Sequence, residues 1–318
     1  MSNIDSSTSI VVITGPTATG KTAVGVELAK QIDGEIVSAD SMQVYKHMDI
    51  GTAKPTLSEM ADIPHHMIDF VSPDDNYSVA RYVKDASKYV DEIIQRGKVP
   101  ILVGGSGQYI ESLLAGRTFS SRSDDKLRRE LEDKYDSVGG DAMLINLSSV
   151  DPEAAERLFP NDKKRIVRAM ETFLTTGKTI SQHDRETKAI PPRYTAMKFA
   201  LTYADRADLY ARIDRRVDEM VSRGLDKEVK SLLQMGLSQK FTSMQAIGYK
   251  ELTEAVVNNS NVDDAIEQIK RESRRYAKRQ LTWLRRDKDV MWITWDGVPD
   301  IDNGVKKIIA MTMYERLA

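Results

Sequence analysis

The chain begins with a hydrophobic run that is typical of a buried strand. Residues 9–14 are rich in β-branched side chains, and the apolar positions of residues 22–31 then recur at helical spacing. Two further short runs, residues 35–39 and 99–103, predict strands, and between them residues 79–94 carry apolar side chains every three or four positions. Strands that alternate with helices predict a parallel sheet that binds its ligands at the carboxyl ends of the strands.

The pattern changes near residue 116. From there to Pro191-Pro192 the chain consists of short helical segments that are rich in charges of both signs. We interpret this region as an all-helical insertion. The predicted division is a first part of the core (1–115), the insertion (116–198) and a second part of the core (199–318).

The second part of the core has strand and helix signals of its own. Residues 194–203 alternate as a strand does, and helical periodicity follows over residues 205–235. A long helix is predicted over residues 262–286, and the run at residues 290–295 predicts one more strand, which closes the predicted series of elements.

A phosphate-binding motif stands between the first strand and the first helix. It reads GPTATGKT and fits the pattern GxxxxGK[S/T]. In such a loop, backbone N–H groups and the helix N-terminus hold phosphate oxygens, the lysine neutralises charge, and the last hydroxyl group reaches a Mg²⁺ ion. The predicted fold is therefore an α/β, P-loop NTPase-like parallel sheet flanked by helices. The loop residues are Gly15, Pro16, Thr17, Ala18, Thr19, Gly20, Lys21 and Thr22.

The acidic residue that an ATPase or GTPase places after a second strand is missing. The strand at residues 101–103 ends in Gly104-Gly105, and the strand-end carboxylate close in sequence is Asp40. An aspartate at this point suits a general base aimed at a substrate, although a strand-end aspartate can also be simply solvated. A kinase for a small metabolite or nucleotide, with Asp40 facing the acceptor hydroxyl group, stays open on this pattern.

Composition narrows the class of protein. No stretch approaches the roughly 20 apolar residues of a membrane span, and residues 1–9 lack the start of an export signal, so we expect a cytoplasmic protein with no membrane partner. The absence of cysteine excludes disulfides and thiolate metal sites, and the four histidines lack the spacing of a metal-binding helix. A monomer is the default expectation.

The charge is distributed unevenly. The whole chain carries 46 Lys and Arg against 48 Asp and Glu, which by itself argues against a polyanionic partner. Residues 1–115 hold nine basic and fifteen acidic residues, however, whereas residues 270–288 hold nine basic and two acidic ones. On a helical projection six of these basic residues lie opposite an apolar stripe that contains Ile266 and Ile269, and such a basic face suits an RNA backbone. The six are Arg271, Arg274, Arg275, Lys278, Arg285 and Arg286.

Four blocks of the sequence resemble one family. They are the phosphate loop, DSMQVYKHMDIGTAKP at residues 40–55, VGGSGQY at residues 103–109 and AKRQLTWLR at residues 277–285. Together they are similar to the bacterial tRNA dimethylallyltransferases, also called isopentenyl-diphosphate:tRNA transferases, over nearly the whole chain. Ser106 and Gln108 stand where that family more often has threonine and leucine.

The resemblance implies an activity and its substrates. The phosphate loop would bind the diphosphate of dimethylallyl diphosphate with Mg²⁺, and the prenyl group would move to N6 of the adenine 3′ of the tRNA anticodon (position 37). Asp40 would be the base, with Ser106 and Lys21 beside it, and Thr22 would hold the metal ion. Arg223 is a further candidate for the diphosphate, although it also fits a solvated arginine at a helix end.

The partner implied is the anticodon stem-loop of tRNA. The base would have to leave its stack to reach the site. Residues predicted to contact tRNA are Asp40, Ser41, Met42, Gln43, Ser106, Arg128, Lys164, Arg165, Arg168, Gly248, Tyr249, Lys250, Arg274, Arg275, Lys278, Arg279, Gln280 and Thr282. A related enzyme class prenylates free AMP, ADP or ATP. The helical insertion and the basic C-terminal helix favour the tRNA acceptor, because a free nucleotide needs neither.

Overall fold

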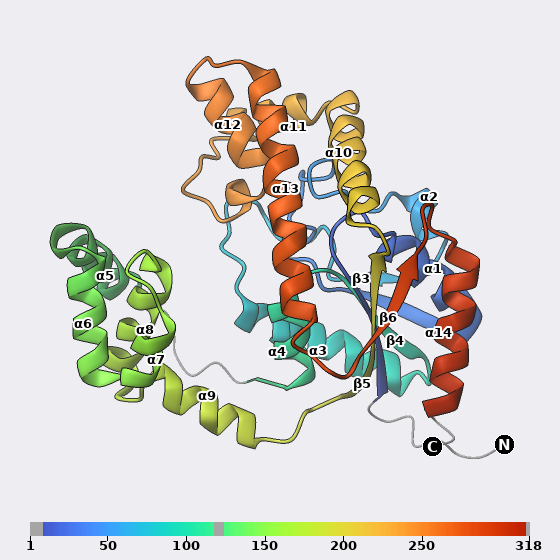
Figure 1. The fold of residues 1–318 in the computed structure, drawn as a ribbon, viewed down its shortest axis with the longest axis horizontal. Coiled ribbons are helices and arrows are strands. Elements are labelled where there is room, and N and C mark those ends of the chain that lie inside the picture. The colour runs from blue at the N-terminus through green and yellow to red at the C-terminus, as the bar shows by residue number, and fades with distance from the viewer. Residues whose placement is uncertain (1–8, 118–123, 316–318) are drawn as a thin grey trace. The chain divides into compact units, whose positions relative to one another are not determined.

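The computed structural model describes residues 9–117 and 124–315 (Figure 1). Within these residues the strands form a single parallel sheet in the order β3-β2-β4-β1-β5-β6. The strands are β1 (Ser9–Thr14), β2 (Gly34–Ser38), β3 (His65–His66), β4 (Val99–Val103), β5 (Thr195–Tyr203) and β6 (Val290–Trp295). The predicted parallel α/β sheet is confirmed.

The chain divides into two compact units, Met1–Gly116 with Arg193–Ala318, and Arg117–Pro192. The first unit contains the sheet and the helices α1 (Lys21–Ile32), α2 (Leu57–Met60), α3 (Val79–Gln95), α4 (Gly107–Leu114), α10 (Arg206–Ser222), α11 (Leu225–Gln234), α12 (Tyr249–Val257), α13 (Val262–Leu284) and α14 (Ile301–Glu315), with a short 3-10 helix η1 (Ser243–Gln245). The second contains α5 (Asp125–Val138), α6 (Gly140–Val150), α7 (Pro152–Arg157), α8 (Lys163–Thr176) and α9 (Ile180–Ala189).

Strand β1 lies at the centre of the sheet because it is apolar on both faces. Its residues from Ile10 to Ile13 are at most 2% exposed. Val11 and Ile13 pack in one cluster with buried residues of α1 and α14, whereas α3 and α4 lie on the other side of the sheet (Figure 1). The chain leaves β1 for β2 on one side and later adds β5 on the other, so the order reverses at β1. Ligand sites of open α/β sheets lie at this kind of reversal, outside the carboxyl ends of the strands.

The hydrophobic pattern predicted the strand at residues 290–295 as the last element, but a helix follows it. Helix α14 follows β6, and its Val305 and Ile308 are completely buried. It approaches β6 closely at Gly304, where a Cβ atom would lie 2.5 Å from the ring of Trp295. This helix was not predicted, because Gly304 and two adjacent lysines interrupt its amphipathic pattern.

The insertion is helical, and it ends earlier than residue 198. Strand β5 starts at Thr195 and pairs with β1 from Ser9 onward, so the last residues of the predicted insertion belong to the sheet. The second unit has its own small core around Leu131, Met143 and Ile166. No helix in the described part of the chain is long and apolar enough to cross a membrane.

Candidate functional site

The phosphate loop joins the carboxyl end of β1 to α1. Gly15 has φ +136°, and a Cβ atom there would lie 2.4 Å from the carbonyl oxygen of Leu201, so this position requires glycine. The hydroxyl group of Thr19 and the ammonium group of Lys21 both donate to the carbonyl oxygen of Pro16, at 2.9 and 2.8 Å. These bonds fold the loop over the N-terminus of α1, where backbone N–H groups favour an anion.

Two side chains from distant segments brace the loop. Gln280 of α13 accepts a hydrogen bond from the backbone N–H of Thr17 and donates one to the carbonyl oxygen of Gly105, each at 3.0 Å. The indole N–H of Trp295 donates to the carbonyl oxygen of Thr19, also at 3.0 Å. The loop is therefore held from α13, from β6 and from the loop after β4.

Gln280 differs from its predicted place on an RNA-facing surface. Its side chain is 9% exposed, because it lies on the stripe of α13 that packs against the sheet. Both ends of its amide group are used within the core. Gln280 therefore also holds the phosphate loop, and since it lines the pocket described below, its contact with tRNA stays a prediction.

Asp40 stands at the carboxyl end of β2, beside the loop that follows β4. Its Oδ1 atom accepts hydrogen bonds from the backbone N–H groups of Met42 and Gln43, at 2.9 and 3.3 Å. Ser106 binds the same segment, since its Oγ accepts a 3.0 Å hydrogen bond from the N–H of Ser41. The predicted catalytic residues Lys21, Asp40 and Ser106 thus follow three neighbouring strands, β1, β2 and β4.

Two residues that the sequence did not single out complete this region. Arg216 of α10 lines the same pocket as Lys21 and Asp40. Tyr276 of α13 also lines it. Arg216 stands in a helix of mixed charge, and Tyr276 stands among the basic residues of α13, so neither has a local sequence signal of its own. Only the docking of α10 and α13 shows that both face the site.

The electrostatics of the pocket favour an anion. Burial, with a smaller contribution from the charge of Arg216, lowers the pKa of Lys21 to about 7, whereas Asp40 acts in the opposite direction. Burial likewise lowers the pKa of Arg216, and the charge of Asp40 partly offsets this. Burial, together with the charge of Asp40, raises the pKa of Tyr276 to about 12. An anionic ligand would relieve the cost of keeping two cations beside each other in a desolvated site.

These residues line a pocket of about 590 Å³. The predicted site residues that line it are Thr17, Ala18, Thr19, Gly20, Lys21, Thr22, Asp40, Ser41, Met42, Gln43, Arg223, Gly248, Arg279 and Gln280. Gly15, Pro16 and Ser106 lie directly behind this lining, in the loops just described. A volume of this size accommodates a small ligand of the size of a nucleotide or a prenyl diphosphate.

Thr22 is the residue predicted to hold Mg²⁺, and the surrounding donors fit that ion. In the described part of the chain no three His, Cys, Asp or Glu side chains are grouped as a metal site. Mg²⁺ commonly keeps several waters and takes other ligands from substrate phosphates, so it needs few protein donors. Thr22 lines the pocket in the first turn of α1, where it suits an ion carried by a phosphate group.

The structure corrects the predicted tRNA contact at Tyr249. Its side chain is completely buried, and its hydroxyl group donates a 2.6 Å hydrogen bond to Glu228, so it does not offer a surface to tRNA. Its neighbour Gly248 lines the pocket, and Lys250 is exposed. Of residues 248–250, Tyr249 therefore belongs to the core of the fold.

The basic face of α13 is present, and two of its members form ion pairs. A shallow groove is lined by Arg275, Lys278, Arg279, Thr282, Trp283 and Arg286. Arg274 forms an ion pair with Asp214 of α10, and Arg275 forms one with Glu272. The predicted tRNA contact at Arg274 is thus in part a contact between helices.

The predicted residues of the second unit lie on α5 and α8. Arg128 and Arg168 both form ion pairs with the buried Glu171, at 2.9 and 3.0 Å, so part of their charge serves the fold of this unit. Lys164 and Arg165 are exposed at the start of α8. These two are the stronger candidates for an external anion.

The sequence model of the IPP transferase family matches residues 43–287. The tRNA dimethylallyltransferase of Acetivibrio thermocellus is 45% identical over 94% of this chain and 96% of its own length. That of Geobacter sulfurreducens is 46% identical over 91% of this chain and 93% of its own.

Solved structures agree. The tRNA isopentenylpyrophosphate transferase of Bacillus halodurans has a TM-score of 0.72 and 41% identity, and the comparison covers 96% of this chain and 97% of that one. A eukaryotic dimethylallyltransferase acting on tRNA has a TM-score of 0.81 and 32% identity, covering 95% of this chain and 78% of that one. With this extent of similarity, the chain belongs to the IPP transferase family.

Proposed function

We propose that this protein transfers the dimethylallyl group of dimethylallyl diphosphate to N6 of the adenine 3′ of the tRNA anticodon (position 37). The observation that carries the proposal is that the phosphate loop and Asp40 line one pocket. An anion site and a carboxylate in the same pocket serve a diphosphate leaving group and an amine acceptor. The names of the relatives support the same reaction.

The reaction breaks one bond and forms another. The bond between the prenyl C1 and the diphosphate oxygen breaks, its electron pair leaves with diphosphate, and N6 forms a bond to C1. The N6 proton passes to the carboxylate of Asp40, whose position is set by the N–H groups of Met42 and Gln43.

The charge that develops on diphosphate needs stabilisation. Backbone N–H groups at the start of α1, together with Lys21 and Arg216, supply it, and Arg223 lies on the same pocket wall. Thr22 would hold Mg²⁺, which adds positive charge to the diphosphate. No γ-phosphate has to be attacked, and this accounts for a phosphate loop that has no acidic residue after β4.

The acceptor side needs a base removed from its stack and a backbone held in place. Asp40, Ser41, Met42 and Gln43 form the wall that would receive the base. The groove on α13 and the exposed Lys164 and Arg165 would hold RNA phosphates. The proposed working unit is a monomer, since one chain supplies all of these residues.

The test is an assay with Mg²⁺, labelled dimethylallyl diphosphate and either unmodified tRNA or AMP. We expect label in tRNA alone, and adenine prenylated at N6 after digestion. Label in AMP alone would replace the proposal by a free-nucleotide prenyltransferase. Transfer of the γ-phosphate of ATP to a small acceptor, without prenyl transfer, would replace it by a kinase.

A further inference from the structure

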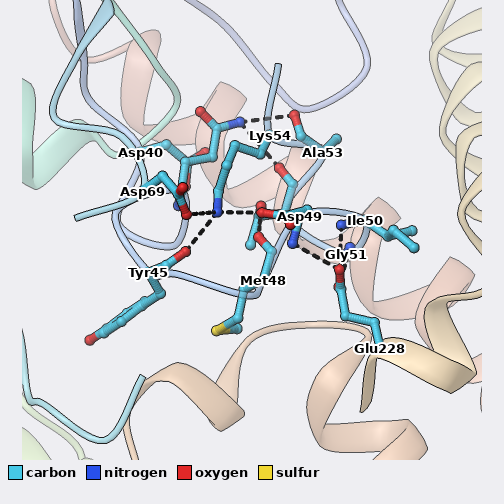
Figure 2. A network of polar contacts seen from close by, with 12 residues as sticks. Asp40, Tyr45, Met48, Asp49, Ile50, Gly51, Ala53, Lys54, Asp69 and Glu228 are labelled. Carbon is cyan, nitrogen blue, oxygen red and sulfur yellow. Dashed lines mark hydrogen bonds and ion pairs between the residues drawn. The ribbon is translucent and has the colours of Figure 1, made fainter. Parts of the chain in front are cut away.

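Two polar side chains, one half-buried and one buried, hold the segment of residues 48–54, which adjoins the pocket (Figure 2). One is Glu228 of α11, and the other is Lys54. Neither lines the pocket, and both meet at Asp49, whose backbone N–H binds Glu228 and whose carboxylate binds Lys54. Their arrangement suggests a role in shaping the pocket from behind.

Glu228 accepts four hydrogen bonds. The backbone N–H groups of Asp49 and Ile50 donate to its Oε2 at 2.9 and 2.8 Å, and that of Gly51 donates to Oε1 at 3.2 Å. The hydroxyl group of Tyr249 donates to Oε1 at 2.6 Å. Four donors converge on the two oxygens, so this position requires a group that only accepts hydrogen bonds.

Lys54 holds the same segment from the other side. Its side chain is 7% exposed, and its ammonium group donates to the carbonyl oxygen of Tyr45 at 2.8 Å and to the carboxylates of Asp49 and Asp69. All three donor positions of the ammonium group are used. The backbone of residues 48–54 is therefore restrained at both ends.

This segment in turn holds Gln43. The side-chain amide of Gln43 donates to the carbonyl oxygens of Thr52 and Ala53, at 3.2 and 3.1 Å. Gly51, Thr52 and Ala53 themselves line the pocket, as does Gln43. A displacement of residues 49–53 would thus move the wall that the proposed function assigns to the adenine.

Glu228 also joins that wall to a neighbouring part of the lining. Tyr249 follows Gly248, and residues 245–248 line the pocket on the side of α12. The Tyr249 ring packs under Gly51, where a Cβ atom would lie 2.5 Å from it. One carboxylate therefore connects residues 49–51 with the turn before α12.

We propose that Glu228 is a positioning residue, which holds these two parts of the pocket lining together and so orients the acceptor adenine toward Asp40. The proposal rests on the function proposed above. Its role requires the carboxylate itself, since an amide of the same shape would direct an N–H donor at another donor. Glu228 never touches substrate in this proposal, so it acts on turnover through Gln43 and the segment of residues 49–53.

The test compares Glu228→Gln with the matched control Asp226→Asn on the same helix, whose carboxylate pairs with Lys230 at the surface. For Glu228→Gln we expect kcat with tRNA to fall about tenfold or more, while KM for dimethylallyl diphosphate stays within about twofold. Tyr249→Phe, which removes one of the four donors, should lower kcat by a smaller factor. The control should keep wild-type values.

Hydrogen exchange gives a readout that does not depend on activity. In Glu228→Gln, the amides of residues 49–51 should exchange at least about tenfold faster, while those of β1 keep their wild-type rates. Unchanged exchange at residues 49–51, or wild-type kcat, would overturn the proposal. So would an equal rise in KM for dimethylallyl diphosphate together with faster exchange throughout the sheet, because that result describes a general loss of stability. If the wild-type chain transfers no prenyl group, the proposed function fails instead.

Discussion

The side-chain oxygen of Gln280 accepts a 3.0 Å hydrogen bond from the backbone N–H of Thr17, 263 positions earlier in the chain. Gln280 lies on the helix whose outer face is basic, and Thr17 lies in the phosphate loop. The same amide group also binds the carbonyl oxygen of Gly105. The helix proposed to bind RNA is thereby attached to the loop proposed to bind diphosphate.

Replacing Gln280 by Leu should weaken binding of dimethylallyl diphosphate. The change leaves the N–H of Thr17 and the carbonyl oxygen of Gly105 without partners, at a cost of about 1–3 kcal/mol, which corresponds to a roughly 5- to 150-fold weaker Kd. Binding can be measured by calorimetry with the diphosphate in the presence of Mg²⁺. Thr282→Val on the exposed face of the same helix is the control, and equal affinities for the two variants would contradict the role of Gln280.

Replacing Asp40 by Asn should lower turnover by about 10²-fold, since it removes the base but keeps the oxygen that accepts the N–H groups of Met42 and Gln43. The affinity for tRNA, measured by filter binding, should stay within a few-fold of wild type. Prenyl transfer at the wild-type rate in the Asn variant would exclude Asp40 as the base.

Lys278 and Arg286 line the groove on α13, and replacing both by Gln should reduce the salt dependence of tRNA binding. Each lost phosphate contact lowers the slope of log K against log salt by about 0.7–0.9. The variant Arg274→Gln serves for comparison. It breaks the ion pair with Asp214, and we expect it to lower thermal stability more than it changes the slope. A double variant with the wild-type slope would show that the groove binds no phosphate.

Glu35 should make the stability of the fold depend on acid pH. Burial by itself raises its pKa, but the hydrogen bond with His66 and the charge and hydrogen bond of Arg96 together hold the pKa below its ordinary value of 4.5. Because the folded pKa is the lower one, the unfolded chain takes up the proton first. The stabilisation is complete above the ordinary pKa of the unfolded chain and is lost as the pH falls through the folded value.

Urea unfolding between pH 7 and pH 3.5 measures this effect. The free energy of unfolding of the wild type should fall more steeply below about pH 5 than that of Glu35→Gln. Glu111→Gln, on the exposed side of α4, is the control and should follow the wild type. Parallel curves for wild type and Glu35→Gln would remove Glu35 as the source of the acid sensitivity.

Several strands were predictable to the residue. The bounds of β1, β4 and β6 agree with the predicted runs, because each is a continuous apolar segment that polar or turn-forming residues delimit. Strand β3 has only two residues, too few for a periodicity to appear, and α14 lacks a clear amphipathic pattern. Both elements form because distant parts of the fold stabilise them: β3 pairs with β2, and α14 buries Val305 and Ile308.

The site residues also fall into two groups, those that the sequence reveals and those that only the tertiary structure shows. Lys21, Thr22 and Asp40 could be found from the chain alone, because their chemistry depends on backbone N–H groups and strand ends that lie next to them in sequence. Arg216 and Glu228 could not, since each stands on a helix whose local pattern is ordinary, and Gln280 was predicted at the site without its contact to the phosphate loop.

The sequence by itself determined a parallel α/β sheet, a phosphate loop at its first strand and a helix with one basic face, because these features depend on residues a few positions apart. Only the tertiary structure decided which polar side chains α10 and α13 turn toward the pocket, and which one of α11 supports it from behind. That choice depends on how these helices pack against one another and against the loops that follow the strands, and a single amide or carboxylate there binds segments that are far apart in the chain.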